Sequence, residues 1–261
     1  MLSQRRRRRQ NAMKINIRGV AFDDVSPEEA VERALTLIRT ADKPCAVHTP
    51  NAEIVQMCVE NPDFLRLINS AELIVPDGSG VILASRIMGR RLKKGKVAGV
   101  VLGERLAEEA AKPENGFGLF LLGGKPGVAE AAAEKLVKKY PGLHICGTND
   151  GYFSDDAAVT EKIRQSGAKL LYVCLGVPKQ EEWMAAHRDA LPGVRLMAGL
   201  GGSLDVYAGL SKRAPKLFIA CGCEWLYRLI REPKRLGRMM KLPKFICGTV
   251  MARLREGRKR P

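Results

Sequence analysis

Residues 118–127 read Gly-Leu-Phe-Leu-Leu-Gly-Gly-Lys-Pro-Gly, an apolar run that ends in a glycine-rich turn. The residues that follow this turn, up to about 140, show the spacing of a helix. Residues 170–181 repeat the arrangement, with Leu-Leu-Tyr-Val-Cys-Leu followed by Gly-Val-Pro-Lys-Gln-Glu. Strands this apolar have no face suited to water, so both units predict buried parallel strands that lead into helices.

The same alternation of apolar runs and helical patterns extends over residues 13–209. Ser26 precedes Pro27, and Glu29 lies three positions after Ser26, which is typical of a capped helix start. The pattern predicts an α/β fold with a Rossmann-like, mostly parallel sheet flanked by helices. The expected strands are Ile15–Phe22, Cys45–Thr49, Leu73–Pro76, Gly118–Leu122, His144–Gly147, Leu170–Gly176 and Arg195–Gly199. The expected helices are Pro27–Thr40, Ala52–Ser70, Gly80–Gly89, Gly99–Lys112, Gly127–Tyr140, Asp155–Gly167 and Lys179–Ala190.

The net charge of +16 is concentrated at the two ends of the 261-residue chain. Arg5–Arg9 contribute +5, residues 210–261 contribute +12, and the body between them is close to neutral. Beyond residue 210, apolar residues recur at helical spacing among basic ones, interrupted by Pro233 and Pro243. We expect a cationic, amphipathic appendage of short helices whose partner is polyanionic, either nucleic acid or anionic lipid.

These observations divide the chain into three parts. Residues 1–12 are expected to be a disordered basic extension, residues 13–209 the α/β catalytic domain, and residues 210–261 the cationic helical appendage. No apolar run reaches the roughly 18 residues of a membrane-spanning helix, and no secretory signal follows the N-terminal arginines. Aromatic residues make up only 5% of the chain, which argues against a stacking platform for single-stranded nucleic acid.

The cysteines and histidines do not have the spacing of metal ligands. The seven cysteines form no C-x-x-C pair, and the three histidines are far apart in the sequence. Free cysteines in apolar surroundings behave as small hydrophobic residues. We therefore expect no zinc or other metal site, structural histidines, and a reducing, cytoplasmic compartment.

Polar segments follow five of the expected strands, and three of these segments are glycine-rich turns that lead into helices. In open parallel sheets, ligands bind at the carboxyl ends of the strands. Glycine lets backbone N–H groups approach a ligand, and helix N-termini attract phosphate. No segment matches the P-loop or the dinucleotide fingerprint, so the set predicts a phosphate-bearing nucleotide of unspecified kind. The segments are Pro50–Glu53, Pro76–Gly80, Gly123–Gly127, Gly176–Glu181 and Gly199–Asp205.

Asp77 is the strongest candidate for reaction chemistry in these segments. A carboxylate at a strand end can accept a proton from an attacking hydroxyl group. Asp77 could equally cap the helix near Gly80 or fix a Pro-Asp-Gly turn. Thr49 and Asn51 offer neutral hydrogen bonds for sugar hydroxyls or phosphates, although Asn51 could equally serve as a helix cap.

A series of longer motifs carries a family resemblance. The chain resembles the WecG/TagA/CpsF family of bacterial glycosyltransferases from about Met13 to Phe245. The motifs are Thr49-Pro-Asn51, Pro76-Asp-Gly-x-Gly-Val81, Gly151-Tyr-Phe153, Gly176-x-Pro-Lys-Gln-Glu181, Gly201-Gly-Ser-x-Asp-Val-Tyr-Ala-Gly209, Lys212-Arg-Ala-Pro215 and Glu224-Trp-x-x-Arg-Leu-x-x-Glu-Pro-x-Arg235.

The resemblance implies transfer of N-acetylmannosamine, or its uronic acid, from a UDP-sugar. The implied acceptor is N-acetylglucosamine diphosphate carried on undecaprenol. The implied reaction is inverting and needs neither metal nor other cofactor. It takes place at the inner face of the plasma membrane, on an anionic surface, in the synthesis of wall teichoic acid or a related surface glycan.

The resemblance also implies roles for particular residues. Asp77 is expected to be the general base, and Thr49, Asn51 and Gln180 to belong to the active site. The expected nucleotide-sugar-binding residues are Gly123, Gly124, Tyr152, Gly176, Pro178, Lys179, Gly201, Gly202 and Asp205. The residues expected to meet the acceptor diphosphate or the membrane are Lys96, Arg213, Arg228, Arg231, Arg235 and Arg238.

The chain departs from the family pattern after the Pro-Asp-Gly helix. The family's Arg-Val-x-Gly-x-Asp-Leu is here Lys96-Val-Ala-Gly-Val-Val-Leu102, with Lys96 for Arg and Val101 for Asp. A lysine does not replace the bidentate grip of an arginine on phosphate, so the departure bears on diphosphate binding or on sugar specificity.

Alternative functions remain at this stage. The basic ends could bind nucleic acid, although such a protein would not require the glycine-rich turns. A nicotinamide-dependent dehydrogenase lacks its fingerprint. A family member could use another donor, such as UDP-N-acetylmannosaminuronic acid or UDP-glucose. Self-association is also left open.

Overall fold

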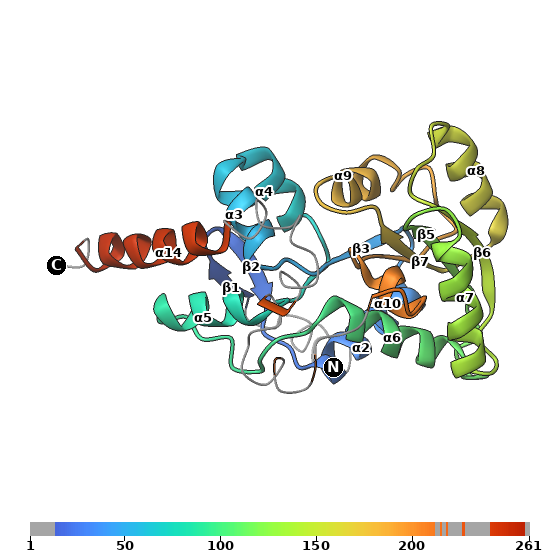
Figure 1. The fold of residues 1–261 in the computed structure, drawn as a ribbon, viewed down its shortest axis with the longest axis horizontal. Coiled ribbons are helices and arrows are strands. Elements are labelled where there is room, and N and C mark those ends of the chain that lie inside the picture. The colour runs from blue at the N-terminus through green and yellow to red at the C-terminus, as the bar shows by residue number, and fades with distance from the viewer. Residues whose placement is uncertain (1–13, 212–214, 216–217, 219–225, 228–240, 259–261) are drawn as a thin grey trace, which may run out of the picture.

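The computed structural model describes residues 14–211, 215, 218, 226–227 and 241–258 (Figure 1). In these residues a six-stranded, fully parallel sheet has the strand order β4-β3-β8-β7-β5-β6, and a separate hairpin joins β1 and β2. The predicted α/β class and the parallel sheet are confirmed. The strands are β1 (Lys14–Ile17), β2 (Val20–Asp23), β3 (Cys45–His48), β4 (Leu73–Ile74), β5 (Leu119–Gly123), β6 (Ile145–Asn149), β7 (Leu170–Cys174) and β8 (Leu196–Gly199).

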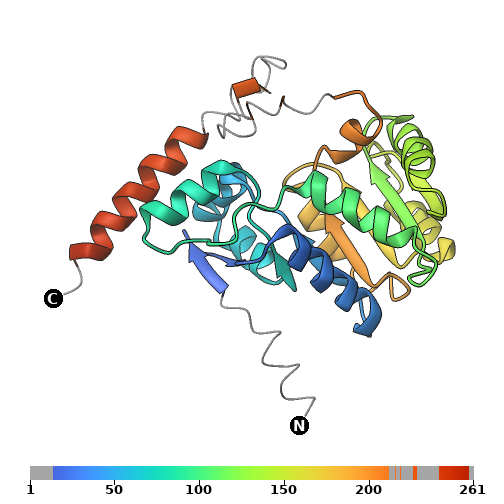
Figure 2. The ribbon, with the colours of Figure 1, turned by 90° about the horizontal axis from the view of Figure 1, so that it is seen from below.

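Helices cover both faces of this sheet (Figures 1 and 2). Alternate strand residues point to opposite faces, so Leu121 and Tyr172 pack with α2, α6, α7 and α10, whereas Phe120 and Val173 pack with the remaining helices. The helices are α2 (Pro27–Thr40), α3 (Ala52–Glu60), α4 (Pro62–Asn69), α5 (Ser79–Ile87), α6 (Gly99–Ala110), α7 (Val128–Lys139), α8 (Asp156–Ser166), α9 (Lys179–Ala186), α10 (Ser203–Tyr207) and α14 (Lys241–Arg258).

Two predicted elements were wrong in a way that local chemistry explains. The expected strand Ile15–Phe22 is the β1-β2 hairpin, because Arg18 and Gly19 both adopt positive φ angles (55° and 98°) and form a two-residue turn. The expected helix Ala52–Ser70 is two helices, α3 and α4. Asn61 is extended before Pro62, and its side chain caps α4 by accepting the N–H groups of Asp63 and Phe64.

The helix start predicted at Pro27 is confirmed in detail. The Ser26 hydroxyl accepts the N–H of Glu29, and the Glu29 carboxylate accepts the N–H of Ser26. These two bonds satisfy backbone donors that a helix start otherwise leaves unpaired. The α2 helix lies against one face of the sheet, where Ala30, Ala34 and Ile38 are buried.

The α14 helix packs against α3 and α5 (Figures 1 and 2). Phe245 is fully buried, and Leu242 reaches the backbone of Gly80. The Lys244 ammonium lies 2.6 Å from the Glu60 carboxylate, and the Arg18 guanidinium donates to the Gly248 carbonyl at 2.7 Å. Pro243, one of the two prolines expected to punctuate the helices, lies within the first turn of α14, where proline is tolerated.

None of the described helices is long and apolar enough to cross a membrane. The basic extension and most of residues 212–240, including Arg213, Arg228, Arg231, Arg235 and Arg238, lie outside the described residues. The predictions made for these residues therefore remain predictions from the sequence.

Candidate active site

The carboxyl ends of the six parallel strands bring the predicted site segments to one edge of the sheet. In the order of the strands, this edge carries Asp77 after β4, Thr49 after β3, the Gly199–Gly202 turn after β8, Gly176 and Gln180 after β7, Gly123 and Gly124 after β5, and Tyr152 after β6. The connection from β3 to β4 runs toward one side edge of the sheet, and the connection from β5 to β6 runs toward the opposite side edge. The crevice expected at such a reversal therefore lies over β8 and β7.

Asp77 is half-buried in the turn between β4 and α5. Its N–H donates to the Pro50 carbonyl at 3.2 Å, and its carboxylate oxygen Oδ2 accepts the N–H of Gly99 at 3.2 Å. Gly99 is the first residue of α6, so the partial positive charge of that helix end favours the ionised carboxylate. The N-cap position of α5 is occupied by Gly78 and not by Asp77.

Thr49 lies beside the Asp77–Gly99 contact. Its hydroxyl donates to the Gly199 carbonyl at 3.1 Å, which ties the end of β3 to the end of β8. A side chain at Gly99 would press on the Thr49 hydroxyl, so the glycine permits this close approach of α6. Asp77, Thr49 and Gly99 thus form one cluster at the carboxyl edge.

Asn51 acts as the N-cap of α3. Its amide oxygen Oδ1 accepts the N–H of Ile54 at 3.1 Å, which is the capping alternative that the sequence left open. Leu242 of α14 approaches Ala52 and Gly80 in the same area. The start of α14 therefore lies next to the β3 and β4 turns that carry Asn51 and Asp77.

Gln180 is a buried residue with 3% of its surface exposed. Its amide oxygen accepts the N–H of Gly201 at 2.8 Å, and its amide nitrogen donates to the Glu181 carboxyl at 2.9 Å. A Cβ atom at Gly199 would collide with this amide. The structure therefore places Gln180 as a support for the Gly199–Gly202 turn.

The glycine turns after β5, β6 and β7 are joined by backbone bonds. Gly123, with φ of 129°, lies against the Cys174 carbonyl at a distance that no side chain would allow. The Gly124 N–H donates to the Cys174 carbonyl at 3.3 Å, and the Gly151 N–H donates to the Gly124 carbonyl at 2.8 Å. These bonds hold the three turns together as one surface of backbone groups.

Two side chains project from that surface. Tyr152 is 70% exposed, next to Gly151 in the turn after β6. The Lys179 ammonium lies 4.7 Å from the centre of the Phe153 ring and donates to the Gly151 carbonyl at 3.2 Å. Lys179 therefore supplies positive charge close to the glycine turns, as phosphate binding requires.

Lys96 and Asp205 also lie near this edge. Lys96 immediately precedes Val97, whose N–H donates to the Pro76 carbonyl at 2.8 Å, so Lys96 adjoins the Asp77 turn. Asp205 lies in α10, where its carbonyl accepts the N–H groups of Leu210 and Ser211.

The predicted residues form two groups along the edge rather than one cluster. Thr49, Asp77 and Gln180 surround β3, β8 and the end of β4, whereas Gly123, Gly124 and Tyr152 lie at β5 and β6. Three strand spacings separate β3 from β5, which amounts to about 14 Å. An extended ligand such as a nucleotide-sugar could contact both groups at once.

Sequence reasoning missed two buried polar residues below this edge. Glu181 is only 2% exposed, and burial raises its pKa to about 7. His48, at the end of β3, is also buried, and burial lowers its pKa to about 4. The helical spacing of Gln180 and Glu181 to Trp183 and Met184 could have shown that both polar residues face inward.

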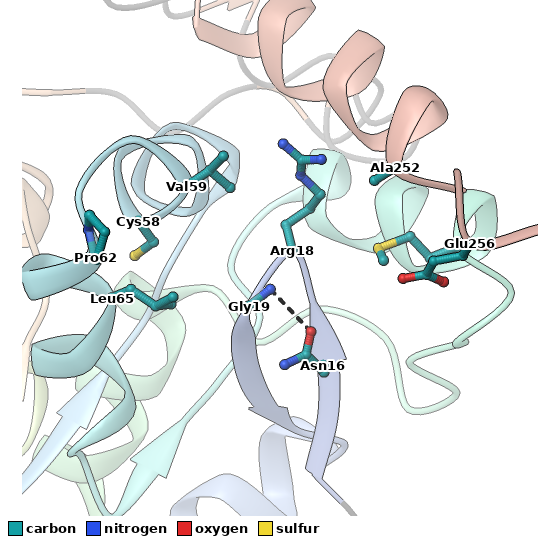
Figure 3. A pocket seen from close by; sticks show the side chains of 10 residues that line it. Asn16, Arg18, Gly19, Cys58, Val59, Pro62, Leu65, Ala252 and Glu256 are labelled. Atoms are coloured by element: carbon teal, nitrogen blue, oxygen red, sulfur yellow. Dashed lines mark hydrogen bonds between the residues drawn. The ribbon is translucent and has the colours of Figure 1, made fainter. Parts of the chain in front are cut away.

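A cavity of about 360 Å³ lies on another part of the molecule (Figure 3). It is lined by the turn of the β1-β2 hairpin, by Pro62 and Leu65 of α4, and by the ends of α3, α5 and α14 that are remote from the edge. Arg18 and Glu256 contribute its charged groups. None of the predicted site residues lines this cavity. Among the described residues, His, Cys, Asp and Glu side chains form no group of three that could hold a metal ion.

Comparison with known proteins identifies the family. The family model described as "Glycosyl transferase WecG/TagA/CpsF family" matches residues 15–259 of this chain. A Bacillus spizizenii protein is 34% identical over 229 residues, which cover 88% of each chain. A Staphylococcus aureus protein is 36% identical over 242 residues, which cover 91% of this chain and 92% of its own. Both are named N-acetylglucosaminyldiphosphoundecaprenol N-acetyl-beta-D-mannosaminyltransferase, as is a Bacillus subtilis protein that is 35% identical over 199 residues.

A parallel sheet with glycine turns and a carboxylate at its carboxyl edge is an arrangement that can bind a phosphate-bearing ligand. The chain belongs to the WecG/TagA/CpsF family and is a glycosyltransferase. The resemblance inferred from the motifs is thereby confirmed.

Proposed function

We propose that this glycosyltransferase moves N-acetylmannosamine from UDP-N-acetylmannosamine to N-acetylglucosaminyl diphosphate undecaprenol. The relatives' names give this sugar and this acceptor, and this chain matches the relatives over most of their lengths. The observation that carries the proposal is the half-buried carboxylate of Asp77, which lies at the N-terminus of α6 beside Thr49. The positive end of α6 favours the ionised form of this carboxylate, and its half-buried position lets it meet a hydroxyl group that approaches along the edge.

The proposed reaction is a single displacement with inversion. Asp77 accepts the proton of the acceptor hydroxyl group as its oxygen forms a bond to the anomeric carbon. The bond between that carbon and the UDP oxygen breaks on the opposite face, and UDP leaves with the electron pair. Thr49 fixes the Gly199 carbonyl and so holds the β8 turn beside the reacting sugar.

The nucleotide diphosphate is proposed to lie over β8, β7 and β5. The glycine turns at Gly123, Gly124 and Gly176 let a ligand approach the backbone at this part of the edge, and Lys179 adds a positive charge nearby. Lys96 lies on the acceptor side, next to Asp77. Arg213, Arg228, Arg231, Arg235 and Arg238 remain sequence-based candidates for contact with the acceptor diphosphate. Together these groups would offset the charge of the leaving UDP without a metal ion.

The proposed site of action is the inner face of the plasma membrane, in the synthesis of wall teichoic acid or a related glycan. The acceptor named for the relatives is attached to a membrane lipid. The α14 helix supports this location, because it exposes Val250, Met251 and Leu254 among basic residues. Apolar side chains with flanking cations are suited to an anionic lipid surface.

The experiment that tests the proposal measures transfer from a panel of UDP-sugars. The panel contains UDP-N-acetylmannosamine, UDP-N-acetylmannosaminuronic acid and UDP-glucose. The acceptor is a short-chain lipid diphosphate of N-acetylglucosamine, and each donor is assayed once with EDTA and once with Mg²⁺. We expect UDP release and a disaccharide-lipid product with UDP-N-acetylmannosamine. A different donor would contradict the proposed sugar, and activity that requires Mg²⁺ would contradict the metal-independent mechanism.

A further inference from the structure

Glu181 occupies an unusual position for a carboxyl group. It lies in the first turn of α9, directly after the turn that follows β7, yet only 2% of it is exposed. One of its oxygens, Oε1, accepts the Gln180 amide nitrogen at 2.9 Å. The other oxygen, Oε2, is buried and finds no hydrogen-bond partner among the described residues. Burial of a carboxyl group is costly, so this position calls for a reason.

A chain of hydrogen bonds runs from this carboxyl group to the edge of the sheet. Glu181 accepts the Gln180 amide nitrogen, and the Gln180 amide oxygen accepts the N–H of Gly201 at 2.8 Å. The same turn is held on its other side by Thr49, which donates to the Gly199 carbonyl at 3.1 Å. The Gly199–Gly202 turn is thus clamped between β3 and α9.

We propose that Glu181 is a positioning residue, which orients the Gln180 amide so that the Gly199–Gly202 turn is held in the shape that binds the sugar donor. A glutamine amide has an oxygen at one end and a nitrogen at the other. Gly201 offers only an N–H, so it requires the oxygen end. Glu181 offers an acceptor at the opposite end and disfavours the flipped amide, in which two donors would face each other.

The surroundings of Glu181 show how this contact persists around neutral pH. Burial raises the pKa of Glu181 to about 7, and the neighbouring Glu182 raises it further. A proton on Oε2 leaves Oε1 available as the acceptor, so both protonation states hold the Gln180 amide. The contact between Glu181 and the Gln180 amide therefore depends on the geometry of the hydrogen bond rather than on the charge of Glu181.

Other titratable groups face this carboxyl group. A cavity of about 180 Å³ is lined by Glu181 together with His48 of β3 and Arg188 beyond the end of α9. Cys58 of α3 is also close, because Glu181 contributes to the rise of its thiol pKa to about 12. Arg188 pairs with Glu72 rather than with Glu181.

This inference rests on the proposed function for its effect on catalysis, but not for its effect on the turn. If the Gly199–Gly202 turn binds the donor, loss of the clamp weakens donor binding and leaves the chemical step at Asp77 unchanged. The expected signature is a raised KM for the UDP-sugar with kcat retained.

Three substitutions distinguish the effect of the length of the Glu181 side chain from the effect of its charge. Glu181→Gln keeps an acceptor at the same distance and removes the charge. Glu181→Asp keeps the charge and withdraws the oxygen by one carbon, out of reach of Gln180. Glu181→Met fills the space and removes both. Glu182→Gln is the matched control, since it removes a carboxylate from the exposed next position of the same helix.

The first measurement is hydrogen exchange of the segment that contains Gly199–Ser203, which does not depend on any activity. We expect exchange about tenfold faster in Glu181→Met and Glu181→Asp, since one buried hydrogen bond is lost. Glu181→Gln and Glu182→Gln should exchange as the unaltered protein does. The second measurement is the KM for UDP-N-acetylmannosamine, which should rise about tenfold in the same two variants.

The outcomes are decisive in either direction. Glu181→Asp that behaves like the unaltered protein, or Glu181→Gln that behaves like Glu181→Met, would overturn the inference. If Glu181→Met does not fold, Glu181→Asp carries the test. If the unaltered protein transfers no sugar, the proposed function fails, while the exchange measurement still decides whether Glu181 holds the turn.

Discussion

The turns after β4 and β7 lie on the same edge of one sheet, yet they use their polar side chains differently. Asp77, after β4, is half-buried and accepts a backbone N–H from the start of α6. Gln180 and Glu181, after β7, are both almost fully buried and bind each other and the Gly201 backbone. A side chain that can meet a ligand is suited to chemistry, whereas one sealed below the edge can act only through its neighbours. Burial therefore separates a proposed base from a proposed support.

The largest expected effect comes from Asp77→Asn. This change keeps the size of the side chain but removes the proton acceptor, so we expect kcat to fall by about 10³-fold. UDP affinity, measured by calorimetry, should stay close to that of the unaltered protein. Asp63→Asn is the control, because Asp63 is an exposed carboxylate at the start of α4. Retention of normal turnover in folded Asp77→Asn would rule out the assigned base.

The second prediction concerns stability and pH in Glu181→Gln. The pKa of Glu181 is raised from 4.5 to about 7, so the folded protein binds this proton more tightly than the unfolded chain does. The resulting stability is fully present below pH 4.5 and is lost as the pH rises through about 7. Glutamine does not titrate, so the variant does not lose this stability. The difference between the free energies of unfolding, variant minus unaltered protein, should therefore rise by about 3 kcal/mol between pH 4.5 and pH 8.

Denaturant unfolding of both proteins at several pH values measures this difference. His48 titrates over the same range in both proteins, since burial lowers its pKa to about 4, and its contribution cancels in the comparison. A difference that stays constant with pH would show that Glu181 ionises normally and is not desolvated as described.

A third, smaller effect is expected for Thr49→Val. The change removes the hydroxyl that donates to the Gly199 carbonyl and preserves the side-chain shape. One lost hydrogen bond at the edge should lower kcat/KM about tenfold. Donor-saturation kinetics would check this, and Thr36→Val is a suitable control, because the Thr36 hydroxyl donates to the Glu32 carbonyl of its own helix, α2. An unchanged kcat/KM would mean that the β3 side of the clamp does not matter.

The smallest expected effect distinguishes the two roles of Asn51. Asn51→Ala removes the cap of α3 and should lower the free energy of unfolding by about 1 kcal/mol. Asn51→Asp keeps a capping oxygen and should retain the stability. If Asn51→Asp nevertheless loses transfer activity, the amide has a role beyond the cap, whereas full activity would leave the cap as its function.

Much of the fold could be predicted because the strands are almost wholly apolar. The β5 and β7 runs are buried on both faces, and their glycine turns mark where each strand ends. The hairpin at Arg18 was missed because an arginine with positive φ gives no signal in the sequence. The break between α3 and α4 was visible as Asn61-Pro62, but the helical periodicity on both sides obscured it.

The candidate site was predicted in its parts but not in its arrangement. The sequence indicated that Asp77, Thr49 and Gly123 follow strands, yet strand order alone decides that Thr49 lies near Asp77 and far from Gly123. The contact of Asp77 with Gly99 joins residues 22 positions apart, and no local pattern predicts it. The buried state of Glu181 likewise depends on which elements cover α9.

The most direct test of this account is the steady-state donor kinetics of Asp77→Asn and Glu181→Met, measured side by side with saturating acceptor. We predict that the two variants change different parameters. Asp77→Asn lowers kcat and leaves the KM for the UDP-sugar unchanged, whereas Glu181→Met raises that KM and leaves kcat unchanged. If both variants changed the same parameter, the division between a chemical group and a supporting group at this edge would be contradicted.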